Sequence, residues 1–310
     1  MLTKLATVVW KSRRPLFFFA SLLFLLFSCA TTPQNQALLP YHSQESHVRQ
    51  GVDFFPSSSP NESFPPHWNW ENIVDGINYT SFDSKNTPLR WHMVSVDLHN
   101  PQITPVAYPT WEDVDSKGIF TGKTTRQFLE KTSSLVALNA SPFETPLSYL
   151  FPQRKIVGLF INQGKLISPA IPRYSAICLA KTNGQWIPKI ISNQAEYPPE
   201  TELALGGFFT ILKDGEVQDF PSFSLDSRTA IGITKDERYL IILYIEGNNK
   251  KLSTGLSYEE SALVMKAAGA WNALQMDGGS SSGLSVVHKD IMDKITLPVA
   301  NILGFTTTFQ

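Results

Sequence analysis

The sequence predicts a folded domain of the α/β class, built from many short strands and a few helices. Two observations support this prediction. Strand-like runs dominate the middle of the chain, and the C-terminal third contains a strand, a helix and a second strand in succession. The chain of 310 residues is 42% hydrophobic and 12% aromatic, which is enough apolar surface for a sizeable core.

The N-terminal residues 1–29 are typical of a lipoprotein signal peptide. A basic region with Lys11, Arg13 and Arg14 precedes the apolar run 16–27, which is shorter than the roughly 20 residues that a spanning helix needs. The run ends at Ser28-Cys29-Ala30, which is similar to a bacterial lipobox with Cys29 as the lipidated residue. The alternative is ordinary cleavage after small residues, which would release a soluble protein.

Residues 30–66 are rich in Ser, Pro, Gln and Asn and lack an apolar period, so we expect a flexible tether before a domain of residues 67–310. The protein is then an exported lipoprotein whose membrane partner is reached through Cys29. Lipidation of Cys29 would leave Cys178 without a partner, and its strand-like surroundings favour a buried apolar role.

The charge balance excludes one class of partner. The chain has 26 Lys and Arg against 27 Asp and Glu, a net charge of -1, and therefore lacks the basic field with which proteins neutralise phosphates of nucleic acid. No H-E-x-x-H, P-loop or paired C-x-x-C motif occurs, so the sequence predicts no metal site and no cofactor.

The domain begins with strands and one short helix. β-Branched and apolar residues, bounded by turn signals, predict strands at 90–98, 134–138, 156–161, 165–167 and 207–212, and a helix at 124–131. Asn162-Gln163-Gly164 and Lys213-Asp214-Gly215 supply the positive φ angles that hairpin turns require.

The C-terminal unit is the most informative part. Residues 239–245 and 271–276 are predicted strands, and the helix between them has a capping box formed by Ser257 and Glu260. A strand-helix-strand unit predicts that the two strands are parallel neighbours. Both strands end in an acid followed by glycine, Glu246-Gly247 and Asp277-Gly278, so we expect two carboxylates at one edge of the sheet.

The segment Asp277-Gly278-Gly279-Ser280-Ser281 is the leading candidate for the site. Backbone amides exposed by such a turn can bind an anion, although a Gly/Ser-rich turn with no ligand fits the residues as well. The segment is also a formal G-x-S-x-G motif, which raises the alternative of a serine esterase that uses Ser281. That motif needs a helix directly after it and a suitably placed histidine, whereas residues 284–288 look extended and only His288 follows.

Two further polar residues stand at strand ends. Arg228 opens a predicted strand and suits bidentate binding of phosphate or carboxylate, but it could equally be a surface arginine paired with Asp226. Asn139 follows the strand 134–138, where its amide could bind sugar hydroxyls or could serve as a cap.

Together these segments resemble the phosphodiester glycosidase family. The strongest likeness runs from Gly255-Leu256-Ser257 to Asp277-Gly278-Gly279-Ser280-Ser281, and the next is Arg228-Thr229-Ala230-Ile231-Gly232 followed by Glu246-Gly247. Weaker matches are Asn139, Gly206-Gly207 and Pro298-Val299-Ala300-Asn301. Three residues depart from the family pattern: Ala140 and Ser280 stand in place of glycines, and Leu297 stands in place of an arginine.

The resemblance implies an α/β (α+β) fold with helices packed against a mixed β-sheet in a single domain. It also implies a hydrolase that acts on a sugar-phosphate or glycan substrate and cleaves a glycosyl-1-phosphodiester. The catalytic residues would be Asp277 as nucleophile or base, Glu246 as partner acid or base, and Arg228 on the phosphate. The phosphate would also contact Gly278, Gly279 and Ser281, and Asn139 and Asn301 would orient the sugar. A lipoprotein that binds a glycan or phosphosugar without cleaving it is the alternative that Ala140 and Leu297 favour.

Overall fold

The computed structural model describes residues 68–308 apart from 85, 147–151, 222, 290 and 292–296. The predicted signal peptide, Cys29 and the tether lie outside these residues. Strands dominate what is described, with 45% strand and 12% helix. Among the described residues, no helix is long and apolar enough to cross a bilayer.

The largest sheet has eight strands, and every strand pair in it is antiparallel. In spatial order its strands are β1 (Glu71–Val74), β2 (Ile77–Asp83), β3 (Arg90–Asp97), β17 (Tyr239–Ile245), β16 (Arg228–Ile233), β18 (Asn272–Gln275), β14 (Thr210–Lys213) and β15 (Glu216–Val217).

Three smaller sheets accompany it, and their pairs are also antiparallel. The five-stranded sheet contains β10 (Lys165–Ser168), β9 (Phe160–Asn162), β13 (Thr201–Gly206), β11 (Ala176–Thr182) and β12 (Gln185–Ile191). The four-stranded sheet contains β19 (Leu284–Val286), β6 (Val136–Asn139), β20 (Ile302–Thr307) and β4 (Ile103–Tyr108). The three-stranded sheet contains β5 (Phe120–Thr121), β8 (Gln153–Ile156) and β7 (Phe143–Glu144).

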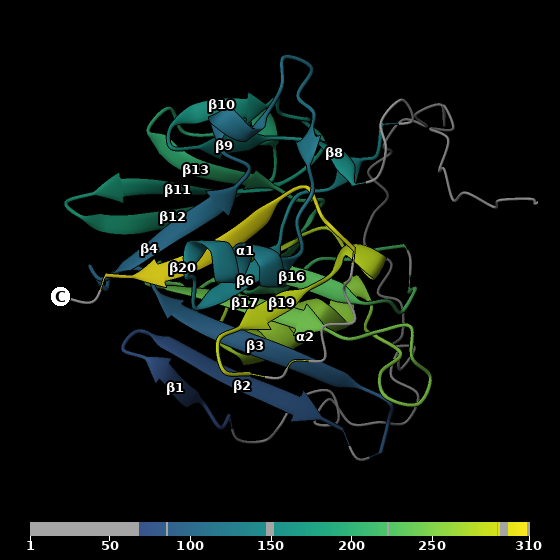
Figure 1. Ribbon diagram of the computed structural model, residues 1–310. Helices are drawn as coiled ribbons and strands as arrows, with labels where there is room; N and C mark the ends of the chain where they lie inside the picture. Colours follow the sequence, from purple (N-terminus) through teal and green to yellow (C-terminus); the bar gives the residue numbers. More distant parts are fainter. Residues whose placement is uncertain are drawn as a thin grey trace, which may run out of the picture. The chain divides into compact units, whose positions relative to one another are not determined.

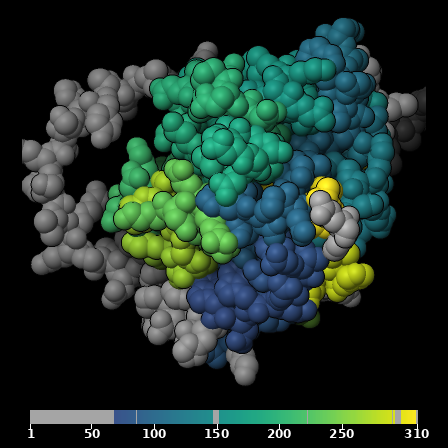
Figure 2. Space-filling model, turned by 90° about the vertical axis from the view of Figure 1, so that its left-hand side faces the viewer, coloured from purple at the N-terminus to yellow at the C-terminus, as the bar shows by residue number. Residues whose placement is uncertain are grey.

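The sheets share one main core. In Figure 1, β4 and β20 lie between the five-stranded sheet above and β1, β2 and β3 below. Figure 2 shows the same order on one face, where the dark blue atoms of the N-terminal strands lie below the teal atoms of the five-stranded sheet. Buried side chains from the eight-, five- and four-stranded sheets, among them Ile231, Leu179 and Leu303, form a single cluster. Burial of apolar surface between the sheets therefore holds the domain together.

Two α-helices occur among the described residues, and each covers one sheet. The helix α1 (Thr125–Thr132) packs Phe128 near Gly304 of β20, where a Cβ would lie 2.8 Å from the Phe128 ring. The helix α2 (Tyr258–Ala267) packs Met265 near Gly232 of β16, where a Cβ would lie 2.6 Å from the methionine methyl group. Short one-turn 3-10 helices occupy Trp111–Asp113, Gln194–Glu196 and Gly279–Ser281.

The predicted fold class is wrong. The structure has four antiparallel sheets with two helices on them, not helices packed against a mixed sheet. The decisive element is β16, which lies between β17 and β18 and pairs antiparallel with both. The two strands flanking α2 therefore run in the same direction but are not neighbours. A short turn from Thr234 to Arg238 joins β16 to β17 as a hairpin. Strand β16 therefore lies next to β17, at the position where the strand-helix-strand rule predicted β18.

Several individual elements were predicted well, but the predicted strand 156–161 is divided between β8, which ends at Ile156, and β9, which begins at Phe160. Strand β17 has the predicted bounds, and α2 begins with the predicted capping box of Ser257 and Glu260. The β9–β10 hairpin turns through Gln163 and Gly164, both with positive φ, as its sequence indicates. Cys178 is buried at 2% exposure, and burial raises the pKa of its thiol to about 11, which is consistent with an apolar role.

Candidate functional site

Three predicted site residues lie at one edge of the eight-stranded sheet, namely Arg228, Glu246 and Asp277. Strand β16 begins at Arg228, opposite Ile245 at the end of β17, while β18 ends just before Met276 and Asp277. Because β16 runs opposite to its two neighbours, its first residue lies at the same edge as their last ones. The two acid-glycine endings, Glu246-Gly247 and Asp277-Gly278, therefore lie at the same edge as predicted. Strand β16 lies between the two strands that carry them.

Asp277 is enclosed by its own loop. Its Oδ1 accepts a hydrogen bond of 3.0 Å from the Gly278 amide. Burial raises the pKa of the Asp277 carboxyl from 3.8 to about 6, while hydrogen bonds from the Ser281 side chain and the Gly278 amide act to lower it. Desolvation is the dominant cause, and it places the group where it can exchange a proton near neutral pH.

Asn139 holds the main chain of that loop. Its Nδ2 donates to the Asp277 carbonyl at 2.8 Å. Its Oδ1 accepts from the Thr229 hydroxyl at 2.6 Å and from the Gly283 amide at 2.8 Å. The residue is 1% exposed, so its observed contacts are with protein groups, and it fixes both ends of the segment that contains Asp277.

Asn301 lies next to β20, which pairs with the strand of Asn139. It is fully buried, with Nδ2 donating to the Tyr108 carbonyl at 2.6 Å and Oδ1 accepting from the Ser141 hydroxyl at 2.9 Å. Its carbonyl accepts from the Ala140 amide at 3.0 Å, and the Ala140 carbonyl in turn accepts from the Asp277 amide at 2.9 Å. Asn301 thus supports the segment behind Asp277, and its predicted contact with a sugar stays a prediction.

Arg228 is buried and has no carboxylate partner among the described residues. It is 7% exposed, with Nε donating to the Leu256 carbonyl at 3.0 Å and Nη2 to the Ser224 carbonyl at 2.8 Å. Its guanidinium lies 4.3 Å from the Tyr258 ring centre. The Asp226 carboxylate, the predicted surface partner, instead accepts from the Ser227 amide and from Asn248 at 2.8 and 2.7 Å.

The third nitrogen of the guanidinium lies next to the Asp277 loop. A Cβ built at Gly278 would be 3.7 Å from Nη1 of Arg228, and no described residue accepts a hydrogen bond from Nη1. A buried cation without a counter-ion is unfavourable, so this nitrogen is suited to an anionic ligand.

The loop amides are arranged differently from the predicted anion site. The Gly278 amide bonds to the Asp277 side chain, and the Gly279 amide donates to the Ser227 carbonyl at 2.9 Å. The Ser280 amide, which belongs to the first turn of a 3-10 helix, has no acceptor among the residues described. Amides in the first turn of a helix have no partner within the helix. A predicted helical turn at Gly279–Ser281 would therefore have pointed to the Ser280 amide, but the sequence was read only as a Gly/Ser-rich turn.

Glu246 lies at the same edge but contacts the opposite neighbour. Its Oε1 lies 3.0 Å from His92 Nε2 and 4.0 Å from Arg90 Nη1, and both of these residues are on β3. His92 Nδ1 lies 2.7 Å from the Tyr79 hydroxyl, which extends the chain of polar contacts to β2. The structure therefore brings Asp277, Ser281 and Arg228 together around one loop, whereas the Glu246 carboxylate is engaged on the other side of β17.

The glycine after Glu246 also has a structural reason. A Cβ at Gly247 would lie 2.3 Å from the Ser227 nitrogen, so glycine is required for close approach of the chain to itself.

A group of aromatic side chains borders the site, and sequence reasoning missed it. We call it the aromatic rim; its members are Tyr174, Phe208, Phe209, Phe220 and Tyr258. Main-chain bonds join it to the end of β18, because the Phe208 amide donates to the Gln275 carbonyl and the Gln275 amide to the Phe209 carbonyl. Phe209 is 39% exposed, and the Arg228 guanidinium stacks over the Tyr258 ring. The rim thus connects the arginine with the molecular surface.

Two buried oxygens at this edge have no hydrogen-bond partner among the described residues. Gln275 is fully buried with Nε2 bonded to the Thr229 and Met276 carbonyls at 3.0 Å each, yet its Oε1 has no partner. Ser282 Oγ, 1% exposed, also has none. Within the described part of the chain, no group of three or more His, Cys, Asp or Glu side chains could hold a metal ion.

The model of one protein family matches residues 134–306, the family described as phosphodiester glycosidase. The chain belongs to the phosphodiester glycosidase family. The matched region contains Asn139, Arg228, Glu246, Asp277 and Asn301, and the family is one of hydrolases.

Solved structures share the fold of this family member. A hypothetical protein from Synechocystis has 14% identity and a TM-score of 0.58, over 78% of this chain and 64% of that one. The zebrafish N-acetylglucosamine-1-phosphodiester alpha-N-acetylglucosaminidase catalytic domain, auto-inhibited by its pro-peptide, has 16% identity and a TM-score of 0.58, over 77% and 86%. An exported protein from Burkholderia pseudomallei has 15% identity and a TM-score of 0.55, over 70% and 74%.

At these identities the likeness shows the fold alone. This chain spans less than two thirds of the Synechocystis chain. No curated protein sequence matches it.

Proposed function

We propose that the protein hydrolyses a glycosyl-1-phosphodiester, adding water across the bond between the anomeric carbon and the phosphate oxygen. The sugar receives the hydroxyl group, and the phosphate leaves as a phosphomonoester with the proton. Membership of the phosphodiester glycosidase family supports the reaction class. The observation that carries the proposal is the pairing of a partly buried carboxyl with a raised pKa, Asp277, with a buried arginine whose Nη1 lies beside the same loop.

The two groups suit the two charges that the reaction develops. Departure of phosphate from the anomeric carbon builds positive charge on the sugar, which a carboxylate stabilises, and leaves negative charge on the phosphate, which a cation stabilises. We assign Asp277 to the sugar side as nucleophile or base, and Arg228 to the phosphate. The Ser280 amide, not those of Gly278 and Gly279, is the loop amide available to a phosphate oxygen.

The other predicted site residues support Asp277 and Arg228 or bind other parts of the substrate. The Ser281 side chain acts to lower the pKa of the Asp277 carboxyl, against the larger effect of burial. Asn139 and Asn301 are positioning residues for the loop. We retain Glu246 as the candidate second acid or base, with His92 as the group through which its proton would be exchanged. The aromatic rim is suited to the group beyond the phosphate.

The test is turnover of a panel of glycosyl-1-phosphodiesters, with free sugar and phosphomonoester measured separately. The expected result is stoichiometric release of both by the native protein and no release by Asp277→Asn. Asp236→Asn, which changes an exposed carboxylate in the β16–β17 turn, is the matched control. Binding of the same compounds by native protein without release of either product would favour the alternative, a glycan- or phosphosugar-binding lipoprotein.

The esterase alternative receives no support from the site. Ser281 is followed by the strand β19 and not by a helix. Its predicted histidine, His288, is solvent-exposed. Labelling of the native protein by a fluorophosphonate, abolished in Ser281→Ala, is the result that would restore it.

We also propose that the protein is exported and anchored through a lipid on Cys29. The basic region, the short apolar run and the lipobox-like ending support this proposal. Metabolic labelling with palmitate should mark the native protein and not Cys29→Ala, and the variant should leave the membrane fraction. An unlabelled native protein that is released from cells would contradict it.

A further inference from the structure

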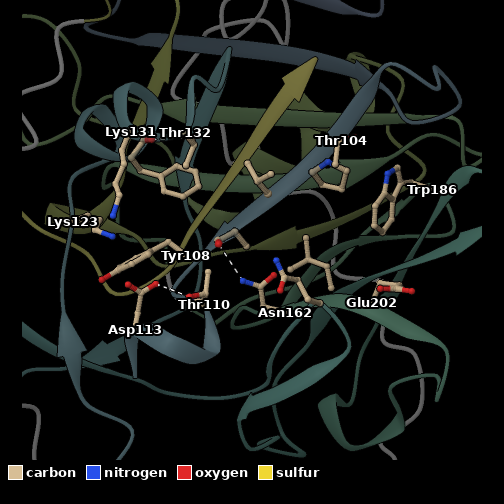
Figure 3. A pocket seen from close by; sticks show the side chains of 16 residues that line it. Thr104, Tyr108, Thr110, Asp113, Lys123, Lys131, Thr132, Asn162, Trp186 and Glu202 are labelled. Carbon is tan, nitrogen blue, oxygen red and sulfur yellow. Dashed lines mark hydrogen bonds between the residues drawn. The ribbon is translucent and has the colours of Figure 1, made fainter. Parts of the chain in front are cut away.

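A cavity of about 440 Å³ lies between the edge strand β4 and the five-stranded sheet, and none of Asp277, Ser281, Arg228 and Glu246 lines it. Figure 3 shows its lining, with α1 at one end and Trp186 of β12 at the other. Asn162 of β9 joins its walls, because Nδ2 donates to the Ala107 and Pro109 carbonyls at 3.1 and 2.9 Å. The volume is in the range of small-molecule sites.

Two ammonium groups converge at the α1 end. Figure 3 shows the side chains of Lys123 and Lys131 directed toward each other above Tyr108. Lys123 Nζ lies 3.5 Å from the centre of the Tyr108 ring. Among the described residues, no carboxylate lies within 4.0 Å of either lysine. Two like charges held close together repel each other, and a bound anion would relieve that repulsion.

The groups around Lys123 also determine the pKa of its ammonium group. Burial lowers the pKa of Lys123, the Asp113 carboxylate acts in the opposite direction, and the neighbouring Lys131 lowers the pKa by a smaller amount. The Asp113 carboxylate is itself engaged, accepting from the Thr110 amide and hydroxyl at 2.9 and 3.0 Å. It therefore moderates the positive charge at this end without a close pairing with either lysine.

The other end of the cavity is different in character. Val106, Phe128, Leu203 and Trp186 contribute apolar surface to the lining, and the Trp186 ring lies at the end away from α1. Glu202, beside Trp186 in Figure 3, is the acidic group at that end and would repel a second anionic group there. Charge complementarity thus fixes the orientation of a ligand, with its anionic head on the two lysines and its apolar body along β4 toward Trp186.

We propose that this cavity is a second ligand site, which binds a small amphipathic anion with a carboxylate or phosphate head at Lys123 and Lys131 and an apolar body against Trp186. The site acts independently of Asp277.

Calorimetric titration of the full chain with decanoate and with octyl phosphate tests the proposal. Decanol, which keeps the chain but not the charge, and inorganic phosphate, which keeps the charge but not the chain, are the ligand controls. We expect saturable 1:1 binding of both amphiphilic anions, at least tenfold tighter than that of decanol or of inorganic phosphate. Equal affinity for decanol and decanoate would overturn the proposal.

Variants separate this site from others. The double variant Lys123→Gln/Lys131→Gln should weaken decanoate binding at least tenfold and leave decanol binding unchanged. Lys235→Gln is the matched control, because Lys235 also lies over an aromatic ring, Trp271, at 4.4 Å but outside the cavity. Native affinity in the double variant would also overturn the proposal.

The opposite wall provides a check that does not depend on the lysines. Trp186→Ala should weaken decanoate and decanol alike, whereas Asp277→Asn should bind both as the native protein does. A loss of binding in Asp277→Asn would place the ligand at the glycosidase site and contradict a second site. Thermal unfolding of each variant shows whether it is folded.

Discussion

The side-chain amide of Asn139 donates a hydrogen bond of 2.8 Å to the main-chain carbonyl of Asp277, and its oxygen accepts from Thr229 and Gly283. One buried side chain therefore joins the end of β6 to the end of β18, the start of β16 and the exit of the Asp277 loop. The geometry of Asp277 depends on a residue that does not itself need to touch the substrate.

Replacement of Asn139 by alanine should reduce both stability and turnover. Three buried groups would lose a partner, and leaving even one unsatisfied costs roughly 1–3 kcal/mol. We expect a loss of several kcal/mol in urea unfolding and a fall in kcat, because Asp277 would no longer be held in place. Asn72→Ala, which removes an exposed asparagine, should change neither quantity. Unchanged stability of Asn139→Ala would show that the network is not as tight as its distances indicate.

Asp277→Asn should abolish turnover while the fold stays intact. Asparagine has nearly the same shape but cannot act as nucleophile or base, so we expect a loss of about 10³-fold or more in kcat, equivalent to about 4 kcal/mol of transition-state stabilisation. Substrate binding by the variant, measured by calorimetry, should persist. Turnover at the native rate would remove Asp277 from the mechanism.

Stability should depend on pH through the same carboxyl. Its pKa is raised from 3.8 to about 6 in the folded protein, so between these values the folded state holds more protons than the unfolded state. The contribution of the group to stability is therefore full below about pH 4 and is lost as pH rises through about 6, by up to about 3 kcal/mol. Asp277→Asn should match the native protein in urea unfolding at pH 4 and be more stable than it at pH 8. A difference that does not change with pH would mean that the carboxyl is not desolvated.

The local patterns in the sequence were reliable because they depend on neighbouring residues. The capping box at Ser257 and Glu260 and the left-handed turn at Gln163 and Gly164 involve contacts within a few residues, and both appear as expected. The position of β16 depends on pairing between distant segments, and the strand-helix-strand rule placed β18 beside β17 instead.

The site shows the same division between local and distant information. The Asp277 loop and the edge position of Arg228 were predictable from strand ends followed by Gly or preceded by polar residues. The engagement of Glu246 with His92 and of the Gly279 amide with Ser227 was not, because the partners come from segments far apart in the sequence or from the exact path of a turn. The aromatic rim combines residues from four separate segments, and no local pattern marks it.

Arg228→Lys should act selectively on substrates with a phosphate. Lysine cannot reproduce the planar set of donors that bonds Leu256 and Ser224 while Nη1 faces the loop, so the phosphate would lose its contact. We expect kcat/KM for a glycosyl-1-phosphodiester to fall by about 10- to 100-fold, which is equivalent to a loss of about 1.4–2.7 kcal/mol of transition-state stabilisation. A glycoside with an uncharged leaving group should be affected much less. Arg238→Lys, at an ion pair with Asp97 on the far end of β17, is the control, and an equal loss on both substrates would place Arg228 in a structural role only.

Phe209→Ala should weaken binding of the group beyond the phosphate. Phe209 is the exposed member of the aromatic rim and packs edge-on to Tyr174, so its ring offers a surface on which a sugar ring or an apolar aglycone can lie. Because such a contact forms equally in the ground state and the transition state, we expect KM to rise several-fold while kcat stays near the native value. The effect should be largest for the bulkiest aglycone in the panel and absent for a methyl phosphodiester. Trp111→Ala removes an aromatic residue of 54% exposure away from the site and should leave KM unchanged. A fall in kcat with unchanged KM would instead mean that Phe209 supports the end of β18, through the main-chain bond between its carbonyl and Gln275, and does not contact substrate.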